Sequence, residues 1–113
     1  MYSQNDVIMV LNIINFTNSR IIKFIEEDKL PLFQNITQGN IKNILNFDFL
    51  NSLESKKLLE NFLEIDLDKI KHRLKFLSIS YVTILDENYP RRLKEIFNPP
   101  AILFYRGDLS LIE

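Results

Sequence analysis

The sequence contains no cysteine, a single histidine and only two glycines in 113 residues. Without cysteine the chain forms neither a disulfide framework nor a thiolate zinc site, and it offers no cysteine nucleophile. The lone His72 has no second histidine to complete a usual zinc site, so we expect it to be exposed to solvent. Two isolated glycines do not form a glycine-rich loop that cradles phosphate. The composition therefore predicts no metal and no cofactor.

The N-terminal segment has none of the features of a targeting signal. Residues 1–6 carry no basic side chain, and the apolar stretch at residues 7–16 is interrupted by Asn12 and Asn15. That stretch is too short to span a bilayer, and no small-residue cleavage site follows it. We therefore expect a cytoplasmic protein without a membrane partner.

Charge of neither sign dominates, but the charges are unevenly distributed. The formal net charge is -1, with 26% charged and 46% hydrophobic residues, which is typical of a folded protein rather than a disordered one. Residues 1–68 contain six Lys or Arg against ten Asp or Glu, whereas residues 69–113 contain eight against five. Because the local field rather than the total charge steers a polyanion, only the second half is expected to attract nucleic acid.

Apolar residues at helical spacing predict short helices over the first 65 residues. Asp6 is expected to cap the first helix, and the polar cluster at residues 17–19 to start the second, which ends before Pro31. Further helices are expected over residues 41–45 and from the capping pair Asn51 and Glu54 to about Leu63. The core positions of the first two helices are Val7, Val10, Leu11, Ile14, Ile21, Ile22, Phe24 and Ile25.

The clearest helical pattern begins at Asp66. Four apolar residues follow it at positions i, i+3, i+7 and i+10, and this spacing predicts that they are buried together on one face. They are Leu67, Ile70, Leu74 and Leu77.

The character of the sequence changes after this helix. Residues 81–85 form a β-branched and aromatic run that predicts a strand, residues 86–88 a turn, and residues 89–96 a short helix with Pro90 in its first turn. Residues 101–105 predict a second strand that ends before Gly107 and Asp108. A helical crossover favours a parallel pair, and a parallel pair normally belongs to a larger sheet. We therefore expect a mainly α protein with a small β part, whose sheet needs strands from elsewhere.

The segment 81–113 resembles the DNA-processing protein A family, also called DprA or Smf. The resemblance lies in a strand, an acidic turn, and a series of residues in the family's order and spacing, and it is strong over roughly the last 45 residues. The residues that carry it are Tyr89, Pro90, Leu93, Ile96, Pro99, Pro100, Arg106, Gly107, Asp108 and Leu109.

The resemblance implies a domain organisation. Residues 1–65 would form a small helical module resembling a SAM or helix-hairpin-helix fold, and residues 66–113 the truncated start of an extended Rossmann-like domain. The module holds only Gly39, and hairpins that contact DNA use glycine to bring backbone amides to phosphate. A helix-hairpin-helix contact with DNA is therefore not expected.

The resemblance also implies a function. Members of the family act in natural transformation, where they bind and protect incoming single-stranded DNA and help to load the RecA recombinase, without acting as enzymes. Their single-strand pocket surrounds a Gly-Ser-Arg motif that does not occur in this sequence. We therefore expect this chain to support folding and protein contacts and to bind DNA weakly. The alternatives are a free-standing helical interaction module and, more remotely, a piece of an enzyme.

Two kinds of residue are candidates for nucleic-acid contacts. Lys71, Lys75, Arg91 and Arg92 belong to the one concentration of cations, which also includes Lys69, Arg73 and Lys94. The simpler interpretation of the helical cations is a solvated face beside a buried stripe, and we favour it. Phe104 and Tyr105 could stack on bases, although alternation along a strand places at least one of them in the core.

The remaining conspicuous residues have structural interpretations. Tyr89, Pro90, Leu93, Pro99 and Pro100 fix the direction of the backbone, and Gly107 supplies a turn with positive φ. The carboxylates Asp66, Asp68, Asp86 and Glu87 stand at a helix start or a turn, where capping rather than catalysis is expected. Unpaired strand edges favour self-association into a homodimer.

Overall fold

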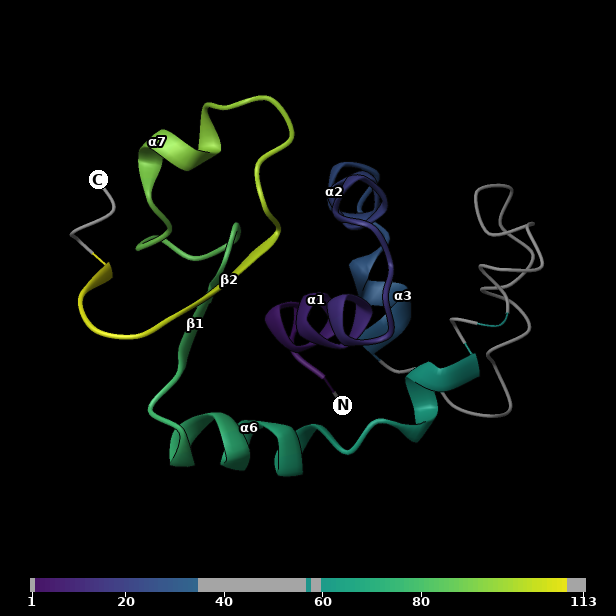
Figure 1. Cartoon of the computed structure of the whole chain (residues 1–113). Coiled ribbons are helices and arrows are strands. Elements are labelled where there is room, and N and C mark those ends of the chain that lie inside the picture. Colours follow the sequence, from purple (N-terminus) through teal and green to yellow (C-terminus); the bar gives the residue numbers. More distant parts are fainter. Residues whose placement is uncertain (1, 35–56, 58–59, 110–113) are drawn as a thin grey trace. The chain divides into compact units, whose positions relative to one another are not determined.

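The computed structural model describes residues 2–34, 57 and 60–109, and the chain divides into two compact units, Met1–Ile65 and Asp66–Glu113. The described part is mainly helical with one small antiparallel sheet (Figure 1). The prediction of a mainly α protein with a small β part is therefore confirmed. The helix expected over residues 41–45, the pair Asn51 and Glu54, and Gly39 lie outside the described residues.

The first unit is built around α1 (Gln4–Ile13), which packs against α2 (Asn18–Glu26) and α3 (Leu30–Gln34). The 3₁₀ helix η2 (Asn61–Glu64) belongs to the same unit. Pro31 lies in the first turn of α3, where its missing N–H costs nothing, so the predicted break is a short gap between two helices. The predicted core positions of α1 are all buried, and α2 buries Ile21 and Phe24 but leaves Ile22 and Ile25 half-buried.

Helix α1 begins one turn earlier than the sequence suggested. Ser3 is the N-cap: its hydroxyl accepts from the Asp6 backbone N–H at 3.0 Å, and its own N–H donates to Asp6 Oδ2 at 3.3 Å. This reciprocal pair is a capping box, in which the carboxylate of Asp6 stands at the third helical position. The prediction of Asp6 as the N-cap is wrong because the helix needs a hydroxyl or carboxylate before its first turn, and Ser3 already supplies it.

Replacing Ser3 with alanine should therefore destabilise α1. Ser3→Ala removes the side-chain acceptor of the capping box, and loss of an N-cap costs about 1 kcal/mol of unfolding free energy. Urea unfolding followed by far-ultraviolet circular dichroism measures this change. The control is Gln4→Ala, at the exposed first position of the helix. Equal midpoints for the two variants would contradict the assignment of the cap.

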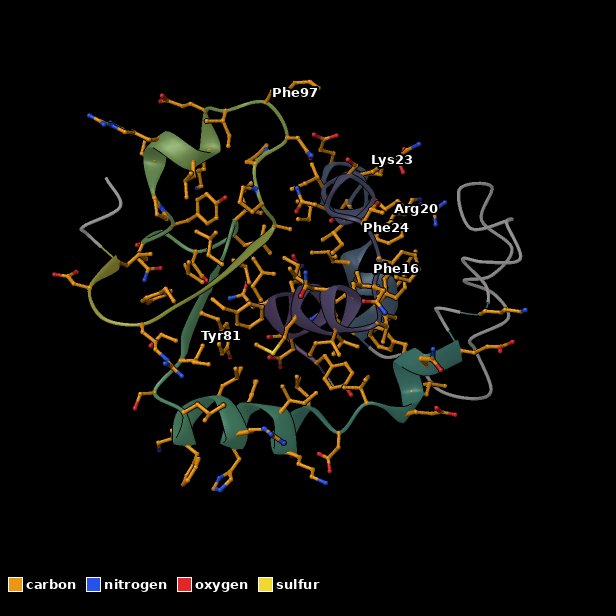
Figure 2. The ribbon with its side chains drawn as sticks, in the orientation of Figure 1. Phe16, Arg20, Lys23, Phe24, Tyr81 and Phe97 are labelled. Atoms are coloured by element: carbon orange, nitrogen blue, oxygen red, sulfur yellow. The ribbon has the colours of Figure 1, made fainter. Side chains whose placement is uncertain are left out.

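The core of the first unit contains a continuous row of aromatic rings. Phe24 lies 5.7 Å from Phe16 and 5.4 Å from Phe33 between ring centroids. Phe33 in turn lies 5.7 Å from Phe62, which lies 5.8 Å from Tyr2. The row thus connects the start of the chain, α2, α3 and η2, and Figure 2 shows its Phe16 and Phe24.

The second unit runs from α6 (Leu67–Phe76) through β1 (Ser80–Thr83) and α7 (Arg91–Lys94) to β2 (Ile102–Tyr105). Asp66 caps α6 as predicted, since its Oδ1 accepts from the Lys69 backbone N–H at 3.1 Å. The predicted stripe of α6 is only partly buried. Leu67 is buried, Ile70 and Leu74 are half-buried, and Leu77 is 41% exposed because α6 has ended before it.

The two strands are antiparallel, with Ser80 opposite Tyr105 and Thr83 opposite Ile102. The expected parallel pair is therefore wrong. The connection between the strands does not cross over, because its two ends are joined: the Ile84 backbone N–H donates to the Ala101 carbonyl at 2.9 Å. Helix α7 is a single turn inside this connection rather than a crossover helix covering a sheet face.

Candidate nucleic-acid interface

The four predicted nucleic-acid residues fall in two places within the second unit. Lys71 and Lys75 line a surface groove of about 600 Å³ beside α6. Arg91 and Arg92 line a separate pocket of about 440 Å³ together with Glu87 and Tyr89. The second pocket thus has a carboxylate among its cations, whereas the groove has none among its lining residues. The structure does not bring the four candidates together into one site.

The groove is formed by one stripe of α6 and one end of the β1–β2 ribbon. On the helix side Lys71, Leu74 and Lys75 are spaced i, i+3 and i+4, so they share a face of α6, and Ser78 follows two residues after the helix ends. On the strand side Ser80 and Tyr105 are directly opposite each other and point to the same side of the ribbon. The full lining is Lys71, Leu74, Lys75, Ser78, Ile79, Ser80, Tyr81 and Tyr105.

The groove was not predicted as a unit, because it depends on how the chain leaves α6. Ser78 adopts a left-handed conformation, with φ 58, and the Ile79 N–H donates to the Leu74 carbonyl at 2.9 Å. This turn leads from the end of α6 into the start of β1, so that Ser80 and Tyr81 line the groove with the last turn of the helix. In the sequence, the groove is marked only by polar side chains about one helical turn apart, which are Lys71, Lys75 and Ser78.

The two aromatic candidates of β2 have different surroundings. Phe104 is 43% exposed, and its ring lies 6.4 Å from that of its cross-strand partner Tyr81. Tyr105 is half-buried and lines the groove. The expectation that at least one of them is a core residue is wrong, because the described ribbon buries neither side chain completely.

The residues with predicted structural roles shape the connection between the strands. Pro90 is the N-cap of α7, and its carbonyl accepts from the N–H groups of Leu93 and Lys94. The hydroxyl of Tyr89 donates to the carbonyl of Pro100 at 2.6 Å, so the two proline-containing motifs of this connection hold each other. Tyr89 itself is 3% exposed.

The structure agrees with the predictions for three further residues of the second unit. Gly107 has φ 84, as expected, and its surroundings leave space for a side chain, so the backbone conformation is what favours glycine there. His72 is exposed, as expected. Asp86 closes the turn after β1, since its Oδ2 accepts from the Thr83 backbone N–H at 2.8 Å.

Over residues 2–34, 57 and 60–109, no three His, Asp or Glu side chains lie close enough together to hold a metal ion. Within the same stretches, none of the helices combines the length and the apolar character of a membrane span.

Most of the second unit is similar to a known protein family. The family model for DNA recombination-mediator protein A matches residues 80–113, which include β1, α7 and β2. The DNA processing protein DprA of Streptococcus pneumoniae is 33% identical over 98 residues, which cover 86% of this chain and 32% of that protein. The protein Smf of Borreliella burgdorferi is 29% identical over 91 residues, covering 78% of this chain and 29% of that protein.

No solved structure matches the chain significantly. The chain spans about a third of the length of the curated relatives that it matches. The family-model match covers the motif from Tyr89 to Gly107, and this chain is similar to a partial, N-terminal-like portion of members of the DprA/Smf family.

Proposed function

We propose that this chain is part of a mediator that receives single-stranded DNA in natural transformation and helps to load the RecA recombinase onto it. The observation that carries this proposal is the family match over residues 80–113, in which the matching residues form the closed connection between β1 and β2. The mediator acts in the cytoplasm, and it binds DNA and proteins rather than catalysing a reaction.

Within that protein, residues 1–65 form the SAM-like helical module and residues 66–113 begin the Rossmann-like domain. The division of the chain after Ile65 supports a boundary between the two parts. The module contributes a packed aromatic core, and the chain has no Gly-Ser-Arg motif. The part of this chain in the function is therefore folding and protein contact.

Exposed apolar side chains in the second unit support a role in protein contact. Phe97 is 99% exposed and Phe76 is 82% exposed, and Figure 2 shows Phe97 on the loop that follows α7. A folded protein gains nothing from leaving such rings in water, and exposed apolar groups gather where proteins associate. RecA and a second copy of the mediator are the partners that we propose.

The coding region tests this proposal directly. We expect the reading frame to continue beyond Glu113 into a Gly-Ser-Arg segment, and we expect its full product to retain RecA on a column together with a bound oligothymidylate. Deletion of the coding region should lower the transformation frequency of the source organism. A frame that ends at Glu113, with an isolated product that neither retains RecA nor affects transformation, would favour the free-standing interaction module.

The isolated chain should bind single-stranded DNA only weakly. Its net charge is -1, and the groove beside α6 holds two lysines. Because few phosphate contacts release few counterions, the affinity for DNA should be low. Fluorescence anisotropy with a labelled oligothymidylate at moderate salt should show no saturation below micromolar chain concentrations. Submicromolar affinity would contradict the assignment of this portion to folding and protein contact.

A further inference from the structure

The groove beside α6 is the feature of the described chain that the proposed function leaves unused. Of the four cations of α6, only Lys71 and Lys75 line it, whereas Lys69 and Arg73 do not. The two lining lysines are spaced i and i+4, so they lie one turn apart on the same side of α6.

The strand side of the groove adds an aromatic ring and hydroxyl groups to the two lysines. Tyr105 is half-buried there, so its ring is held in place and loses little further freedom when a ligand packs on it. Ser78 and Ser80 supply side chains that both donate and accept hydrogen bonds. Cations, a fixed ring and hydroxyls within one groove match a ligand that combines a phosphate with a planar base.

We propose that this groove binds one nucleotide unit of a single-stranded nucleic acid, with the phosphate between Lys71 and Lys75 and the base on the ring of Tyr105. This inference rests on the proposed function and names the residues through which the weak binding of this chain occurs. Single strands fit the site because their bases are free to stack on aromatic side chains, whereas the bases of a duplex are stacked on each other. The volume of about 600 Å³ lies within the range of ligand pockets.

Nuclear magnetic resonance titration of the 113-residue chain locates weak binding directly. The probes are an oligothymidylate, an abasic oligonucleotide of the same length, and polyglutamate as an acidic polypeptide. With the oligothymidylate, we expect amide shifts at the groove residues, among them Lys75, Ser80 and Tyr105. The abasic probe should bind more weakly, since it keeps the phosphates but lacks the bases that stack.

Three variants separate the parts of the site. Tyr105→Leu should weaken oligothymidylate binding by roughly tenfold, the effect of losing a modest stacking contact, and leave abasic binding unchanged. Lys75→Gln should weaken both by several-fold and reduce their dependence on salt. Lys69→Gln is the matched control, because it removes the same charge from the same helix outside the groove. Dispersed amide spectra confirm that each variant is folded.

The outcomes distinguish the occupants. Shifts outside the groove, or equal weakening by Lys69→Gln and Lys75→Gln, would overturn the site and indicate diffuse attraction. If polyglutamate binds as tightly as the oligothymidylate, the groove is a site for an acidic polypeptide and not for a nucleotide unit. Neither result affects RecA retention by the full product, so failure of the groove and failure of the proposed function remain distinguishable.

Discussion

Phe24→Ala should remove most of the stability of the first unit. The Phe24 side chain is 1% exposed and contacts the rings of both Phe16 and Phe33, so its truncation leaves a cavity in the middle of the aromatic row. Loss of a buried phenylalanine costs about 3–5 kcal/mol. That is a large part of the total of about 5–15 kcal/mol that stabilises a typical domain. Urea unfolding followed by the helical circular dichroism signal measures the change.

The chain offers a control of identical chemistry. Phe97→Ala removes the same atoms from a side chain that is 99% exposed, and the unfolding free energy should change by no more than about 0.5 kcal/mol. A double-mutant cycle between Phe24 and Phe33 should give a coupling of about 0.5–1.5 kcal/mol for the ring pair. Equal losses at Phe24 and Phe97 would show that the aromatic row is not the core.

The sequence predicted the interior of this core better than the ends of its helices. Periodicity identified Val10, Leu11 and Phe24 because a helix that buries one side must repeat apolar residues at that spacing. Helix ends are harder to predict in this chain, because glycine most often marks the end of a helix and the chain has only two glycines. The residues that end α1, α2 and α6 in the left-handed conformation are Asn15, Asp28 and Ser78, at φ 75, 55 and 58.

These three residues take the place that glycine most often occupies. After each of them the next backbone N–H reaches back across the last turn, as from Phe16 to the Leu11 carbonyl at 3.0 Å and from Lys29 to the Phe24 carbonyl at 2.8 Å. Both bonds have the geometry of a Schellman motif. Asparagine and aspartate tolerate the left-handed region better than most residues, and a side chain there gives no clear warning in the sequence.

The same limitation explains why the direction of the strands and the groove were missed. Both depend on turns: Ser78 sets the direction in which the chain leaves α6, and the Thr83–Asp86 turn ends β1 two residues before the apolar run ends. Hydrophobic patterning gives the existence of a strand, but it does not give the direction in which its partner returns. The family resemblance, by contrast, depended on the order of motif residues and was confirmed.

Tyr89→Phe should loosen the second unit, because the Tyr89 hydroxyl closes the connection between β1 and β2. The variant keeps the buried ring and removes only the bond of 2.6 Å to the Pro100 carbonyl. A partly buried carbonyl left without its donor costs about 1–3 kcal/mol. We expect a lower urea midpoint and faster amide exchange at Ile84, whose N–H is bonded to Ala101 at the base of the same connection. Tyr81→Phe removes an equal hydroxyl from a half-buried ring and should change neither.

The effect should also depend on pH, in a direction fixed by the burial of Tyr89. Desolvation by burial raises the pKa of its phenol above the ordinary value of 10.0. As the pH rises, the phenol of the unfolded chain therefore ionises first, and this ionisation lowers the free energy of the unfolded state but not that of the folded state. The stabilisation is complete below pH 10.0 and is lost as the pH rises through the pKa of the folded state.

Comparing the native chain with Tyr89→Phe isolates this titration, because the two proteins share every other titratable group. The advantage of the native chain in urea midpoint should be constant at neutral pH and should shrink above pH 10.0. At that point the phenolate also has no proton to donate to Pro100. An advantage that stays constant, or grows, into alkaline solution would mean that the Tyr89 hydroxyl does not hold this connection closed.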